Sequence, residues 1–374
     1  MIEILIAALI GVVSMVVIMQ IFITFEGKKR SISSGGDAQA SGIFALYTLQ
    51  DDLRQAGYGV SSFNLLGCNL SWVPTAVTPA VTVTLTAMAP VTINHSGIPV
   101  GDANTDTLLI VYGNGNGSAE GDIIATSTSP NYSVQTPTAF ARNDFVIALP
   151  SVRPNPCGLT LAQVTGDPLA VTPPTVTPSA WVAGMTGGTL FNIGNNPRIQ
   201  AYAIRGGNLT VCDYRVNNCG DTTASVVADT TVWVPIVNDI VSLRAQYGRD
   251  TTIPMDGIAD VYNQTTPSAG SGFQCNWARI SAVRIVVVAR NAQYVRESNT
   301  RYDATNVPSS EAPIWAGSSI NPPGSTVNAI DLSVPANAPP NETWKNEWFL
   351  YRYRKFETVV PIRNVLWLGA LAGC

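Results

Sequence analysis

The feature that most constrains this chain is an uninterrupted apolar run close to its beginning. Residues from Ile4 to Phe25 are 22 consecutive positions without a charge. As a helix rising about 1.5 Å per residue, the run would span about 33 Å, enough to cross the hydrocarbon core of a bilayer. It lacks the preceding basic region, the shorter apolar stretch and the small-residue cleavage site of a signal peptide. We therefore expect a membrane-spanning helix that stays in the mature protein.

A carboxylate, Glu3, stands directly before the apolar run. In a plain membrane anchor it would lie in the solvated interface and have no special role. In a helical polymer it would be buried among apolar helices and would need a cationic partner, because an unpaired buried carboxylate is costly. A catalytic role has no supporting residues nearby. The sequence after the apolar run decides between the membrane-anchor and the helical-polymer interpretations of Glu3.

The sequence after the apolar run predicts a second helical half. Residues 41–59 carry an apolar stripe at helical spacing, made of Leu46, Leu49, Leu53 and Ala56. The charged residues of this stretch lie off the stripe: Asp51, Asp52 and Arg54. One face of this half is therefore expected to pack on a globular head.

Two short features separate the helical halves. The basic run Lys28-Lys29-Arg30 directly follows the apolar segment and is interpreted as its interfacial flank. Gly35 and Gly36 follow, and each weakens a helix by about 1 kcal/mol. We expect a bend or a melted turn at this glycine pair.

Beyond residue 58 the pattern changes from helical to alternating, with β-branched runs separated by Gly, Pro and Asn. The run "AVRIVVVAR" (282–290) predicts a buried central strand. The expected fold class is α+β, a long N-terminal helical spine followed by a mostly antiparallel β-sheet head. The expected organisation is an apolar helix over 1–30, a joint and amphipathic half over 31–58, and a β-rich head over 59–374.

Composition and cysteine content favour an extracytoplasmic head. Charged residues make up 12% of the chain, against about 25% in an ordinary soluble domain. The formal net charge of −4 gives no basic footprint for nucleic acid or anionic lipid. An even number of cysteines is compatible with disulfides in an oxidising compartment, with the pairing left open: Cys68, Cys157, Cys212, Cys219, Cys275 and Cys374. Cys212 and Cys219 bracket "DYRVNN" and could staple a hairpin.

Candidate ligand sites are few. Asp250, Asp256 and Asp260 lie close in sequence and could bind calcium, although the EF-hand spacing is not met and a plain hairpin loop is favoured. No other cofactor is expected. His95 is the single histidine, stands in a turn-like context and is expected in a surface loop. Basic and aromatic residues alternate over 345–356, but an ordinary half-exposed strand explains them better than DNA contact.

No sequence motif supports catalysis. There is no Gly-rich phosphate loop and no nucleophile elbow, and no Ser or Cys has a plausible histidine partner. We expect a protein without enzyme activity.

The segments "MIEILIAALIGVV" and "GIFALYTLQDDLRQAGYG", the latter followed by Cys68, resemble the type IV pilin superfamily. More narrowly, the chain is similar to PilW-like minor pilins, relatives of the J-type pseudopilins of type II secretion. Further segments that resemble successive family strands are residues 106–113, 145–166, 237–250, 278–290 and 353–364. The resemblance therefore covers nearly the whole chain.

The resemblance implies a pilus subunit that assembles through its N-terminal helix with copies of itself or other pilins. In this family a peptidase removes a short leader, the new amine is methylated, and the glutamate pairs with a neighbour's amine. Applied to this chain, the resemblance implies that Glu3 sets the subunit register and that Met1 supplies the amine. Glu3 lies two residues nearer to Met1 than the family's glutamate usually lies to its first residue. The resemblance also implies residence in the inner membrane before assembly and in an extracellular filament afterwards. A membrane-tethered adhesin or DNA receptor and a secretion pseudopilin are the alternatives.

Overall fold

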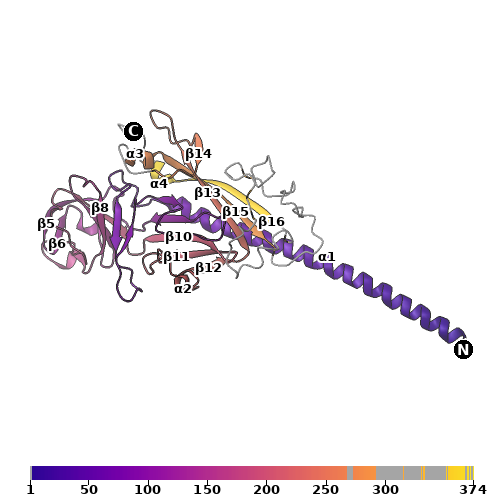
Figure 1. Ribbon diagram of the computed structural model, residues 1–374. Helices are drawn as coiled ribbons and strands as arrows, with labels where there is room; N and C mark the ends of the chain where they lie inside the picture. Colours follow the sequence, from indigo (N-terminus) through magenta and orange to yellow (C-terminus); the bar gives the residue numbers. More distant parts are fainter. Residues whose placement is uncertain are drawn as a thin grey trace.

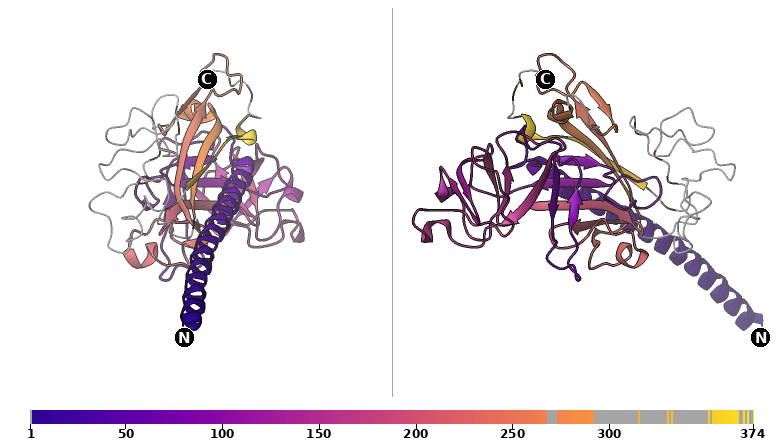
Figure 2. Two further views of the ribbon diagram at one scale, coloured as in Figure 1. Left: turned by 90° about the vertical axis from the view of Figure 1, so that its right-hand side faces the viewer. Right: turned by 60° about the vertical axis from the view of Figure 1, so that its left-hand side comes forward.

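The computed structural model describes residues 2–267, 273–291 and 353–366, together with residues 315, 330, 332, 351, 369, 371 and 374. It consists of one long helix and a β-rich head (Figure 1). The helix, α1, spans Ile2–Gln55, and its N-terminal part projects far beyond the head in every view (Figure 2). The expected α+β fold class is confirmed.

The two halves of α1 have different surroundings. The apolar side chains that the structure describes between Ile4 and Phe25 are exposed, whereas Leu49 and Leu53 in the second half are 0% exposed. The stripe predicted from helical spacing is therefore buried, with Leu46 partly buried beside it. The helix continues without interruption through Gly35 and Gly36, so the melted turn expected there is wrong for this structure.

Within the described residues the head contains three sheets that are antiparallel except where β1 pairs with β8. The seven-stranded sheet has the order β2-β1-β8-β7-β9-β5-β6, with β1 at Asn69–Trp72, β2 at Val83–Leu85, β5 at Asp122–Thr128, β6 at Asn131–Val134, β7 at Phe145–Leu149, β8 at Gly158–Gln163 and β9 at Thr189–Gly194. Strands β5 and β6 lie at the end of the head farthest from the N-terminus (Figure 1).

The other two sheets lie nearer to α1. The five-stranded sheet has the order β12-β11-β10-β4-β3, with β3 at Val91–Ile93, β4 at Leu108–Tyr112, β10 at Arg198–Arg205, β11 at Asn208–Asp213 and β12 at Val234–Val237. The four-stranded sheet has the order β14-β13-β15-β16, with β13 at Ile240–Arg249, β14 at Val261–Asn263, β15 at Ile280–Arg290 and β16 at Tyr353–Pro361. The predicted central strand is confirmed, since β15 lies between β13 and β16 and is almost wholly buried.

Short helices complete the described fold: η1 at Pro137–Ala139, η2 at Pro168–Ala170, α2 at Ala224–Val227, α3 at Phe273–Ala278 and α4 at Arg363–Leu366. The six cysteines form three disulfides, Cys68–Cys157, Cys212–Cys219 and Cys275–Cys374. The second of these joins the end of β11 to the turn that follows it. The third ties the last residue of the chain to α3.

The five-stranded sheet separates two apolar cores. Alternate residues of a strand point to opposite faces. In β4, Leu108 and Ile110 belong to the core beneath α1, whereas Leu109 and Val111 belong to the core shared with the seven-stranded sheet. This explains why all five residues of β4 are buried.

The second half of α1 lies very close to the four-stranded sheet at Gly42. A Cβ atom built at Gly42 would overlap the ring of Phe356 on β16, whereas one built at Gly36 would meet no atom within 4 Å. The absence of a side chain at Gly42 thus lets the helix lie directly on the strand.

The single histidine is buried, so its predicted place in a surface loop is wrong. His95 is 6% exposed. Its Nδ1 accepts from the Gly97 N–H at 3.0 Å, and its Nε2 lies 3.0 Å from the Thr86 carbonyl oxygen. Since an acceptor at Nδ1 requires the proton to be on Nε2, the ring is neutral. Burial lowers its pKa below 6.5, and the hydrogen bond to Thr86 only partly opposes this.

We expect Gly42→Val to lower the free energy of unfolding of the full chain by about 1–3 kcal/mol, because the added side chain overlaps the ring of Phe356. The matched control Gly36→Val adds the same side chain where space is open, and should change stability by no more than about 0.5 kcal/mol. Urea denaturation in detergent micelles measures both. Equal effects at the two positions would contradict the close approach.

We expect the stability of the head to fall as the pH drops below about 6.5. The folded pKa of His95 lies below its unfolded value, so below about pH 6.5 the unfolded chain binds a proton that the folded chain resists. Above that pH both states are neutral and the histidine contributes no slope. Replacing His95 with Gln should remove up to about 1.4 kcal/mol per pH unit of slope between the two pKa values, measured by urea titration at several pH values. A variant with the wild-type slope would overturn this assignment.

Candidate functional site

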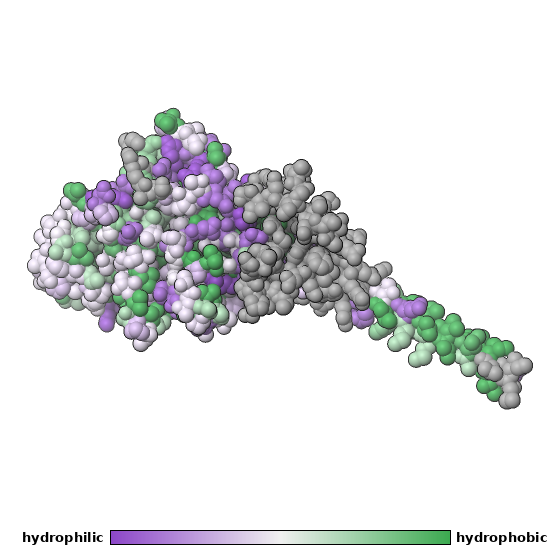
Figure 3. Space-filling model, viewed as in Figure 1, coloured by the Kyte–Doolittle hydropathy of each residue, from purple (hydrophilic) through white to green (hydrophobic). Residues whose placement is uncertain are grey.

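The most unusual surface of the molecule is the N-terminal half of α1. Hydrophobic residues cover this half in Figure 3, and the exposed fraction is 74% for Ile4 and 67% for Phe25. The segment Ala8–Glu26, with a mean hydropathy of 2.5 and none of its residues buried, is long and apolar enough to cross a membrane. A helix that is apolar on all sides needs lipid or other helices around it.

Glu3 lies in the first turn of this helix, where the helix dipole favours a carboxylate. Its side chain is exposed, and no ion pair joins it to any residue that the structure describes. Met1, the expected source of the amine, lies outside the described residues.

Asp52 fixes the second half of α1 to the five-stranded sheet. Its Oδ1 accepts from the hydroxyl of Tyr112 at 2.6 Å, and its Oδ2 accepts from the hydroxyl of Tyr202. Burial, followed by the hydrogen bond and negative charge of Asp52, raises the pKa of Tyr112, and burial followed by the same charge raises that of Tyr202. Both tyrosines thus stay protonated and donate to the carboxylate.

Gln200 extends this cluster. Because the Tyr202 hydroxyl donates to Asp52, its oxygen is free to accept, and the amide of Gln200 is oriented to match. With the amide nitrogen toward the cluster, it donates to the Tyr202 oxygen at 2.9 Å and to Asp52 Oδ2 at 3.2 Å. The amide oxygen then accepts from Arg198 Nη1 at 2.9 Å.

The end of α1 is held by a second polar contact. The last carbonyl groups of a helix have no partner within the helix. The Asn364 side chain, on α4, donates from Nδ2 to the carbonyl oxygens of Gln55 at 3.1 Å and Ala56 at 3.0 Å. This asparagine caps the helix from a segment more than 300 positions later in the chain.

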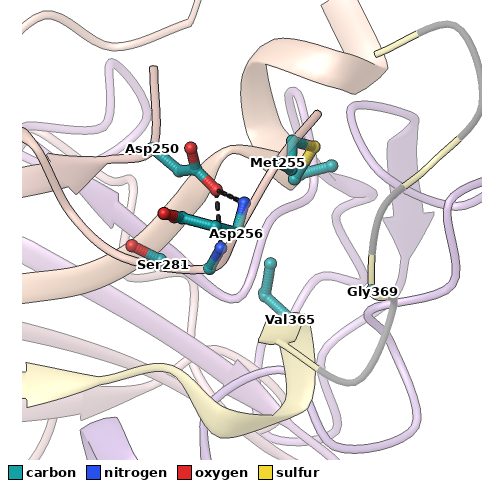
Figure 4. Close-up of a pocket in the computed structure, with 8 residues that line it drawn as sticks. Asp250, Met255, Asp256, Ser281, Val365 and Gly369 are labelled. Atoms are coloured by element: carbon teal, nitrogen blue, oxygen red, sulfur yellow. Dashed lines mark hydrogen bonds between the residues drawn. The ribbon is translucent and has the colours of Figure 1, made fainter. Parts of the chain in front are cut away.

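The three aspartates considered for calcium lie in the loop between β13 and β14. Asp250 is fully buried, and its Oδ2 accepts from the backbone N–H groups of Asp256 at 2.8 Å and Gly257 at 2.7 Å (Figure 4). Its Oδ1 accepts from the N–H and hydroxyl of Thr252. Although burial raises the pKa of Asp250, these hydrogen bonds outweigh it and hold the pKa below its usual value.

The other two aspartates also bond within the loop. Asp256 Oδ1 accepts from the Ile258 N–H, and Asp260 Oδ2 accepts from both the N–H and the hydroxyl of Thr251. No group of three His, Cys, Asp or Glu side chains in the described part of the chain is placed to hold a metal ion. Calcium binding at this loop stays an untested prediction. The backbone N–H groups and threonine hydroxyls that already donate to the aspartates would compete with a calcium ion for the same carboxylate oxygens. Residues 345–350 and 352, considered for DNA contact, lie outside the described residues.

The strands beneath α1 belong to the part of the chain that matches a known family. Residues 216–364 match the family model described as Type IV Pilus-assembly protein W. This part of the chain is therefore similar to the PilW family of type IV pilus-assembly proteins. The match begins after β11, covers β12 to β16 and ends at Asn364, the residue that caps α1. The PilW-like part therefore supplies the sheet on which the helix lies.

A solved structure of a type IV-like pilin from Thermus thermophilus aligns with 15% sequence identity over 60% of this chain and 87% of that chain. The TM-score of this alignment is 0.20, too low to define a common fold. No curated protein matches the chain. The fold class therefore rests on the helix and sheets described above.

We expect Asp52→Asn to lower the free energy of unfolding by about 1–3 kcal/mol, because an amide cannot accept from both tyrosine hydroxyls. Asp51→Asn removes the same charge from an exposed neighbour and should cost no more than about 0.5 kcal/mol. Urea denaturation of the full chain in detergent micelles compares the two. If Asp51→Asn is as destabilising as Asp52→Asn, the effect comes from helix charge and not from the cluster.

Proposed function

We propose that this PilW-like chain is a non-enzymatic type IV pilus subunit that polymerises through α1 into an extracellular filament. The observation that carries the proposal is the division of α1 into a half packed on the head and a half that is apolar and exposed. Such a half-helix is stable in a bilayer and among other apolar helices. A subunit with this shape can be inserted in the inner membrane before assembly and can then pack into a filament core.

Glu3 would set the stagger between subunits. Among apolar helices its charge has a desolvation cost that a neighbour's ammonium, such as the amine of Met1, would offset. Docking would then be favoured at the one axial position that brings the two charges together. The carboxylate is exposed in the single chain, which leaves it accessible to a neighbouring subunit.

The region between the two halves would adapt during assembly. The basic residues 28–30 would flank the membrane, and the glycine pair that follows is the place where α1 has the lowest intrinsic helix propensity. The pair is helical in the single chain. We propose that it yields when the helix passes from lipid into a filament.

We expect Glu3→Ala to reduce incorporation into filaments about tenfold while membrane levels of the subunit stay unchanged, corresponding to about 1.4 kcal/mol for a lost ion pair. Asp37→Ala, which removes an exposed carboxylate from the same helix outside the apolar run, is the matched control. Immunoblots of sheared filaments and of membranes, from cells with the variant as the only copy, give both quantities.

The outcomes separate the candidate functions. Normal incorporation of Glu3→Ala would refute the register role, and the absence of any subunit from sheared filaments would favour a tethered adhesin or receptor. Counting subunits along purified filaments distinguishes a tip or minor subunit, near one per filament, from a main structural subunit. Assembly only in the presence of a type II secretion system would identify a pseudopilin.

A further inference from the structure

The loop between β13 and β14 is tied together by internal hydrogen bonds and presents apolar side chains to solvent. Its backbone is held from inside by the four hydrogen bonds that Asp250 accepts. Yet Ile253 is 85% exposed and Ile258 is 65% exposed. A preformed surface loses less conformational entropy when a partner binds than a flexible one does. Exposed apolar residues on such a loop point to a contact surface.

A pocket of about 350 Å³ lies beside this loop (Figure 4). Its walls are mainly apolar and come from Met255, Ala278 and Val365. Protein pockets that bind ligands have volumes of about 300–1,000 Å³, so this one is at the small end of the range. It has room for one large side chain and little more.

Two polar groups of the pocket have unused bonding capacity. Ser281, on β15, is 4% exposed, and its hydroxyl has no hydrogen-bond partner in the structure as described. A buried hydroxyl without a partner costs free energy, which a bound group could recover. Asp256 is exposed, and only its Oδ1 accepts a hydrogen bond from the described residues. Its other oxygen can receive a cation.

The rim of the pocket is acidic. Arg279, a cation that contacts this loop, is turned inward, where its Nη1 donates to the carbonyl oxygens of Asp250 and Thr252 at 2.9 Å each. Asp256 and Asp260 are both exposed on the loop. A partner with a positive charge beside an apolar group would thus match both the wall and the rim.

We propose that this pocket is a docking site for a segment of a partner protein that inserts one apolar side chain and sets an adjacent arginine or lysine against Asp256. The Ser281 hydroxyl pairs with a polar group of the inserted segment. The pocket is lined by Val365 of α4, beside the end of α1 that Asn364 caps, and thus lies at the opposite end of the helix from the exposed apolar half. The proposal therefore does not rest on polymerisation of the chain. A metal ion is a poor occupant, because the oxygens of Asp250 are already taken by protein donors.

The full chain in detergent micelles, with ¹³C-labelled methionine methyl groups, tests the site by NMR. The probe is acetyl-leucyl-arginine amide, and Met255→Leu identifies the reporting signal. We expect a saturable shift of the Met255 signal. The glutamate counterpart, acetyl-leucyl-glutamate amide, and the polar counterpart, acetyl-seryl-arginine amide, should each bind about fivefold more weakly.

Variants separate the charge from the fold. Asp256→Asn keeps an oxygen that can accept from the Ile258 N–H, so we expect the loop to keep its structure. Because the negative charge is removed, the affinity for the arginine probe should fall about fivefold. Asp51→Asn, at an exposed site on α1, should bind like the wild type. The proposal is overturned if no probe shifts the signal, if all three shift it equally, or if Asp256→Asn binds normally. It is also overturned if the signal shifts with protein concentration alone, because the occupant is then a second copy.

Discussion

The burial of one apolar stripe of α1 on strands β15 and β16 is the contact on which the rest of the structure depends. Leu49 and Leu53 lie on one face of α1 and Ala56 directly follows the helix, and all three are fully buried. The stripe joins the second half of the helix to the sheet, whereas the apolar side chains of the first half are exposed among the residues that the structure describes. One half of α1 thus belongs to the interior of the head, and the other half faces the surroundings of the molecule.

Polar contacts turn this apolar contact into a defined geometry. Apolar packing alone would tolerate a helix that slides or rotates, because dispersion and burial are not directional. Asp52 fixes the rotation of the helix through two tyrosine hydroxyls, and Asn364 fixes its end through two carbonyl groups. The direction in which the free half projects is thus set by a few hydrogen bonds around the stripe.

Local patterns allowed the helical stripe and the central strand to be predicted, because each depends on spacing within a few turns or one strand. The partners of Asp52 lie 60 and 150 positions away, so its role could not be predicted from the helix alone. His95 and Asp250 are ordinary polar residues in loop-like sequence, and no local pattern distinguishes them from exposed polar residues, although the fold buries both. The glycine pair illustrates the opposite case, in which a real local preference for breaking the helix is overridden by the continuous helix around it.

The disulfides have a mechanical consequence for a molecule attached at one end. Cys68 and Cys157 enclose a separation of 89 residues, and Cys275 and Cys374 enclose one of 99. A fully extended residue adds at most about 3.6 Å of length, so each bridge withholds on the order of 300 Å of chain from stretching under tension. Between the first and third bridges, force applied through α1 can lengthen only the stretch from Cys157 to Cys275. The head therefore has a covalently set limit to its extension.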